Sequence, residues 1–168
     1  MPHLRARLTS VRLRVTGVNV PDEVRSLEDA NIHFEGHVED LAAFYNQVRV
    51  VIVPIRFGAG VKLKTIEALQ RGVPIVSTVV GAEGIDPRGR DAIDVTDDPE
   101  QFAERVAVLL TDRAYWLQRR NAIAELLQRW QEPRRGDTWT EALEKVLATR
   151  KRPAGRTRPG APGAIMGG

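Results

Sequence analysis

A glycine-rich turn over Gly58–Lys64 is the part of the chain best suited to binding chemistry. It follows the apolar run Val50–Val53, and a helix is predicted to run from about Val61 to Gln70. Glycine lets backbone N–H groups approach a ligand closely, and the start of a helix adds free amides and the positive end of the helix dipole. The turn is therefore a candidate anion site made of Gly58, Ala59, Gly60, Val61, Lys62 and Lys64.

Two lysines stand where the helix is predicted to begin. A lysine in the first turn of a helix faces the positive end of the dipole, which is unfavourable. Lys62 and Lys64 make better sense if an anion such as a diphosphate lies between them. The alternative is a pair of solvated lysines beside an ordinary turn, because a short Gly-x-Gly pattern is a weak signal. The turn matches neither the Walker loop nor the dinucleotide fingerprint.

Glu67 lies five residues after Lys62, among apolar residues of the same predicted helix. A carboxylate accepts several hydrogen bonds, so it would suit the two hydroxyls of a ribose. A solvated glutamate with no ligand is the equally consistent alternative.

Other site chemistry is not indicated by the sequence. His3, His33 and His37 do not pair at metal-ligand spacing, and the chain has no Asp-x-Asp, no Gly-x-Ser-x-Gly and no cysteine. We therefore expect no metal and no cofactor, and we assign no catalytic residue.

The surrounding pattern is one of short strands alternating with helices. Strands are predicted at about Val11–Val15, Asn31–Glu35, Val50–Val53, Pro74–Ser77 and Ala92–Val95. Such alternation predicts right-handed crossovers and a parallel sheet, and therefore an α/β fold. The third strand is apolar on both faces, which is typical of a parallel strand covered by helices on both sides.

The C-terminal part is predicted to be helical over about 114–131 and 138–148, and then to end in a tail, 150–168. The tail has five basic residues, no acidic residue and eight Gly or Pro among its 19 positions, so we expect it to be disordered. Removing those five from the chain's 25 basic residues leaves 20 against 22 acidic ones in residues 1–149. That balance predicts no nucleic-acid binding. We expect one domain over 1–149, with peripheral membrane contact by the tail as an open alternative.

The chain is 42% hydrophobic and has no apolar run of about 20 residues and no signal peptide at its start, which predicts a cytoplasmic protein.

Several segments of the sequence, taken in their order along the chain, resemble the conserved motifs of one protein family. They are Phe34–Leu41, Val50–Lys64, Glu67–Leu69, Gly72–Thr78 and Gly81–Ile85. Together they resemble the C-terminal, donor-binding half of the GT-B glycosyltransferases, in the retaining family-four branch known as glycosyl transferases group 1. The resemblance covers about residues 8–149, and it implies a Rossmann-like parallel sheet followed by C-terminal helices.

This resemblance implies a nucleotide-sugar donor, such as a UDP- or GDP-sugar, whose sugar is transferred with retention. The base would lie by Gly36, His37 and Val38, the ribose by Glu67, and the diphosphate by the turn at 58–64. The donor sugar would lie near the loop of Gly81, Ala82, Glu83 and Gly84.

Two departures from the family pattern affect the expected activity. Ala59 stands where the family often has a glutamate, and the resemblance begins after the family's acceptor domain and the first strand of its donor domain. We therefore expect an incomplete sheet, with Val11–Val15 and Val50–Val53 on either side of a missing central strand, and no transfer by this chain alone. A separate N-terminal acceptor domain or self-association would cover those edges. A non-catalytic nucleotide-sugar-binding module and a degenerate gene fragment remain alternatives.

Overall fold

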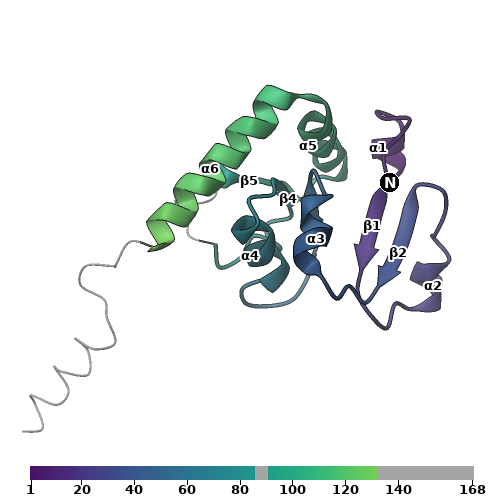
Figure 1. Ribbon diagram of the computed structural model, residues 1–168. Helices are drawn as coiled ribbons and strands as arrows, with labels where there is room; N and C mark the ends of the chain where they lie inside the picture. The colour runs from purple at the N-terminus through teal and green to yellow at the C-terminus, as the bar shows by residue number, and fades with distance from the viewer. Residues whose placement is uncertain (86–90, 132–168) are drawn as a thin grey trace, which may run out of the picture. The chain divides into compact units, whose positions relative to one another are not determined.

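Five short parallel strands alternate with helices along residues 1–85 and 91–131, which are the residues that the computed structural model describes (Figure 1). The strands are β1 (Leu13–Thr16), β2 (Ile32–Gly36), β3 (Val51–Val53), β4 (Ile75–Ser77) and β5 (Ile93–Val95). The helices are α1 (Pro2–Arg5), α2 (Asp22–Arg25), α3 (Leu41–Asn46), α4 (Leu63–Gln70), α5 (Pro99–Thr111) and α6 (Arg113–Gln131). The predicted order of elements is confirmed. The predicted helix 138–148, the tail 150–168 and the domain boundary between them lie outside the described residues.

The strands form two sheets rather than one. β1 pairs with β2, and β3, β4 and β5 form a second sheet in that order, with every pairing parallel. In the described part of the chain, no ladder joins β1 to β3. The expected incomplete sheet is therefore confirmed: the strands on either side of the gap do not pair with each other. The side chains of β1 are all half-buried, whereas those of β4 are all buried.

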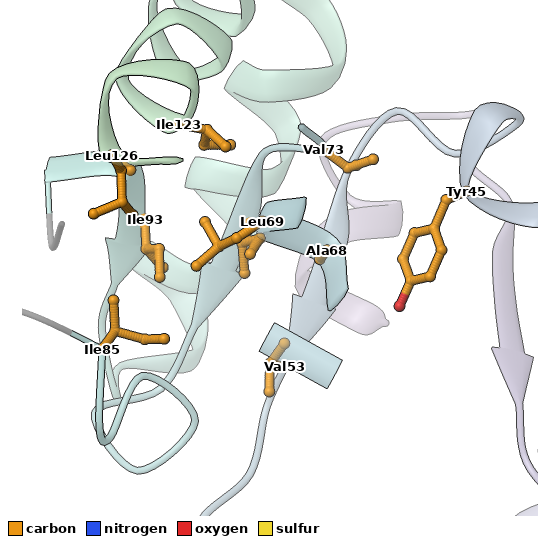
Figure 2. Close-up of a cluster of buried hydrophobic side chains, with 11 residues drawn as sticks. Tyr45, Val53, Ala68, Leu69, Val73, Ile85, Ile93, Ile123 and Leu126 are labelled. Carbon is orange, nitrogen blue, oxygen red and sulfur yellow. The ribbon is translucent and has the colours of Figure 1, made fainter. Parts of the chain in front are cut away.

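Helices cover both faces of the sheet that contains β4. Ile75 lies in a cluster with Leu69 of α4 and with Ile123 and Leu126 of α6 (Figure 2). Val76, the next residue of β4, lies instead in a second cluster with Leu4 of α1 and with side chains of α5. Consecutive residues of a strand point to opposite faces, so β4 is the buried centre of the described unit.

The helix ends follow local sequence signals. The side chains of Asp40, Asp98 and Asp112 accept hydrogen bonds from amides in the first turns of α3, α5 and α6. At the end of α4, Gly72 has a φ of 67°, and its amide donates to the Leu69 carbonyl. This arrangement is typical of a Schellman C-cap, which sends the chain directly into β4.

A buried charge cluster joins β5 to α6. The Asp94 side chain is 2% exposed, and its Oδ1 atom lies 2.7 Å from Nη2 of Arg119 and accepts a hydrogen bond of 2.8 Å from the Tyr115 hydroxyl. Burial raises the pKa of the Tyr115 phenol, while the hydrogen bond from Arg119 opposes that shift. Asp94 Oδ2 is buried and has no hydrogen-bond partner among the described residues.

Candidate functional site

The candidate site is formed by two loops, 54–62 and 78–84, which follow the carboxyl ends of the neighbouring strands β3 and β4. Open α/β sheets bind ligands beyond these strand ends. The Thr78 hydroxyl joins the loops, because it donates to the Ile55 carbonyl and accepts a hydrogen bond of 3.1 Å from the Gly81 amide. The two loops are thus held together before any ligand binds.

A second buried hydroxyl fixes the same loop to α4. Thr65 is fully buried, and its Oγ1 atom donates to the Gly81 carbonyl at 2.8 Å. A Cβ atom at position 81 would lie 2.3 Å from Ser77 Oγ and 2.6 Å from the Val53 carbonyl oxygen, so only glycine fits this close approach. Gly81 and Ala82 are buried, and the Gly81 amide and carbonyl are both bonded internally. The exposed members of the predicted sugar loop are therefore Glu83 and Gly84.

The Lys62 amine lies inside the glycine turn rather than pointing into solvent. Its Nζ atom donates to the carbonyls of Gly58 at 2.9 Å and Gly60 at 2.7 Å, and it lies 3.4 Å from Oε2 of Glu83. The side chain is 11% exposed. Gly58 and Gly60 have φ values of 111° and 81°, in the left-handed region that favours glycine.

The N-terminus of α4 has no side-chain cap, since its N-cap residue is Lys62. The backbone amides of Leu63 and Lys64 have no hydrogen-bond acceptor among the described residues. Lys64 is exposed, and within residues 1–85 and 91–131 its side chain forms no ion pair; the same holds for Arg56 in the preceding loop. Free amides, the positive end of the dipole and two unpaired cations make this a position that favours an anion.

Glu67 faces α3 rather than open solvent. The Tyr45 hydroxyl donates to its Oε2 atom at 3.5 Å, and Tyr45 is 8% exposed. Burial raises the pKa of the Tyr45 phenol, and the charge of the Glu67 carboxylate raises it further. The phenol therefore stays protonated and can donate to the carboxylate across the physiological range. Glu67 is half-buried, so its carboxylate can also accept hydrogen bonds from other donors.

The predicted base-binding residues lie at the end of β2 and directly after it, in the other sheet. Gly36 has a φ of 67°, His37 is exposed and Val38 is half-buried. Among the described residues, no hydrogen bond or ion pair joins these three to the turn at 58–64. The structure therefore joins the predicted diphosphate turn to the predicted sugar loop through Lys62 and Glu83. Among the described residues, the hydrogen bond of Glu67 is to Tyr45 of α3, and the predicted base loop makes no hydrogen bond or ion pair with the turn.

Sequence reasoning missed Thr65, Thr78 and Tyr45. The two threonines hold the loops, and Tyr45 orients Glu67. Thr78 directly follows a buried strand, where ligand loops begin, and that placement is the signal that could have found it. Thr65 has the sequence environment of an ordinary helix residue. Nothing in the neighbouring sequence distinguishes Tyr45 from Phe44, the other aromatic residue of α3.

The described residues contain no group of three or more His, Asp or Glu side chains placed to hold a metal ion. They also contain no helix with the length and apolarity needed to cross a membrane.

The parallel α/β architecture, with loops after β3 and β4 at one edge of the sheet, is that of a Rossmann-like domain. The family comparison is more specific: the model of the glycosyl transferases group 1 family matches residues 1–112. The chain therefore belongs to that family.

The proteins similar to this chain include one curated relative and one solved structure. An uncharacterized 44.6 kDa protein in the cps region of Klebsiella pneumoniae is 34% identical over 68 residues, which is 40% of this chain and 18% of that protein. The crystal structure of TarM matches with a TM-score of 0.60 and 14% identity, over 89% of this chain and 30% of the other. The fold is that of an incomplete GT-B C-terminal domain, and the chain matches less than a third of the length of either relative.

Proposed function

We propose that the described unit binds the nucleoside diphosphate part of a UDP- or GDP-sugar, as the donor-binding part of a retaining glycosyltransferase. One observation carries the proposal: α4 begins with free amides at Leu63 and Lys64, in a family of sugar-transferring proteins. A diphosphate is the anionic part of a nucleotide-sugar, and it becomes the leaving group of the transfer. Amides and cations that hold it stabilise the negative charge that develops there.

Each residue has a stated part in this proposal. The amides of α4 and the side chain of Lys64 bind phosphate oxygens, and Glu67 accepts hydrogen bonds from the ribose hydroxyls. Tyr45 holds the Glu67 carboxylate in place. Transfer also needs an acceptor site, which we do not assign to any described residue, so we expect binding without turnover from this chain alone.

Titration with UDP and GDP by calorimetry tests the proposal. Lys64→Ala should weaken binding about 10- to 100-fold, because a hydrogen bond to a charged group contributes about 1.5–3 kcal/mol. Arg113→Ala is the matched control, since it also removes one exposed positive charge. Arg113 lies at the start of α6. This part of α6 is near the amino end of β3, because the Trp116 indole donates a hydrogen bond to the Arg49 carbonyl. The proposal fails if neither nucleotide binds, or if the two variants weaken binding equally.

A further inference from the structure

The Lys62 ammonium has no unused hydrogen-bond donor in the empty site. A lysine amine carries three N–H groups. Three acceptors surround it, namely the carbonyls of Gly58 and Gly60 and the carboxylate of Glu83. With 11% of its side chain exposed, the ammonium cannot turn outward without leaving the loop. A phosphate oxygen can reach Lys62 only by replacing one of these acceptors.

The three acceptors are not equally replaceable. The two carbonyls belong to the turn itself, and they lie at 2.9 and 2.7 Å from Nζ. The Glu83 carboxylate is farther away, at 3.4 Å, and its side chain is 51% exposed. It is also the only one of the three that carries a full negative charge, which is the property that it shares with a phosphate.

We propose that Glu83 is an internal anion that neutralises Lys62 in the empty site and gives way to a phosphate oxygen of a nucleoside diphosphate. This inference rests on the proposed function, and it gives Glu83 a different part from the sugar contact that the sequence suggests. The exchange is one anion for another at the same ammonium. Since Glu83 belongs to the loop after β4, the exchange also removes one contact between that loop and the turn after β3, while the Thr78 hydroxyl still joins the two loops.

An exchange of this kind has a definite consequence for affinity. Glu83 competes with the ligand for Lys62 and repels its negative charge. Glu83→Gln keeps the length of the side chain and removes the charge, so it should lower the Kd for UDP about fivefold, which corresponds to about 1 kcal/mol. A residue that served as a sugar or phosphate ligand would give the opposite sign or no change.

Calorimetric titration of UDP and of uridine, at low ionic strength, tests the exchange. Glu104→Gln is the matched control, because Glu104 is an exposed glutamate on α5 and its loss changes the net charge equally. We expect tighter UDP binding for Glu83→Gln alone and no change in uridine binding for either variant, because uridine has no phosphate. Equal or weaker UDP binding by Glu83→Gln overturns the exchange, and so does a tightening that Glu104→Gln or uridine reproduces.

A labelling measurement without nucleotide tests the internal pair by itself. Acetic anhydride should modify Lys62 more slowly than Lys64 in the unaltered protein, and Glu83→Gln should speed the modification of Lys62 only. Unchanged Lys62 reactivity overturns the pairing with Glu83. If UDP binds to none of the proteins, the proposed function fails and the exchange with it. If UDP binds equally to the unaltered protein and Glu83→Gln, the exchange alone fails.

Discussion

Arg119→Met tests the charge cluster that joins β5 to α6. The Asp94 carboxylate is 2% exposed, and its ion pair with Arg119 is 2.7 Å long. The next cation, Arg105, lies 4.0 Å away and is 38% exposed, so it replaces Arg119 poorly. Removing one partner of a buried pair costs about 3–5 kcal/mol, because an uncompensated charge stays behind. Arg119 is 21% exposed, which places the expected loss at the lower end, about 3 kcal/mol.

That loss is a large share of the roughly 5–15 kcal/mol that stabilises a domain. Adding Asp94→Asn to the Arg119→Met variant removes the stranded charge, so the double variant should regain about 1–2 kcal/mol.

Urea denaturation followed by circular dichroism measures these differences. Arg113→Met is the control on the same helix, because Arg113 is exposed and no described residue pairs with it; it should stay within about 0.5 kcal/mol of the unaltered protein. The reasoning is refuted if the double variant is less stable than Arg119→Met. It is refuted equally if Arg119→Met costs no more than the control.

Four further predictions concern other parts of the unit. Gly81→Ala places a Cβ atom 2.3 Å from a neighbouring side chain and should cost about 1–3 kcal/mol in a thermal melt; an unchanged midpoint would contradict the close approach. Asp98→Ala should lower the free energy of unfolding by about 1 kcal/mol, because two capping hydrogen bonds from amides of α5 are lost. Asp98→Asn should have the same free energy of unfolding as the unaltered protein in urea denaturation. The hydrogen bond from Arg14 holds the pKa of Glu35 below its ordinary value, so this stabilisation is present at neutral pH and is lost as the pH falls below about 5. Arg14→Gln should flatten that part of the stability–pH curve. Removing residues 150–168 should leave the melting midpoint within about two degrees, and a fall of about ten degrees would show that the tail packs on the body.

The order of elements was predictable because each strand is a short segment in which the residues are either mostly apolar, as in β3 and β4, or alternate between apolar and polar, as in β1. The caps Asp40 and Asp98 and the end of α4 at Gly72 are local signals, so their positions were predictable as well. The packing of β3 against both clusters, with Val53 in one and half-buried Ile52 against the other, followed from the unbroken run Val50–Val53. The start of α4 was predicted two residues too early. The helix begins at Leu63 rather than Val61, because Lys62 has extended backbone angles and is the N-cap residue.

The sequence predicted where in the chain the candidate site lies, but it did not predict which side chains contact one another there. Glycines at 58 and 60 and the lysines after them marked the turn. The position of the Lys62 amine could not be predicted, since Glu83 is 21 residues away in sequence and meets it only through the pairing of β3 with β4. The same holds for Thr65 and Gly81, which are 16 residues apart. The burial of Asp94 also depends on helices that follow it in the chain.

The division of the strands into two sheets also bears on how the protein opens. No backbone hydrogen bond of a ladder crosses from β1 to β3 in the described residues. Side-chain packing connects the two sheets instead, since Val11, just before β1, lies in the same cluster as Val76 of β4. A cooperative folding unit requires contacts that are lost together, and here the two ladders can be lost separately. The strand β4 is buried and pairs with a strand on each side, so its amide hydrogens should exchange at a rate set by global unfolding. Those of β1 and β2 should exchange through a local opening of lower free energy, so the molecule should show two levels of protection within one chain.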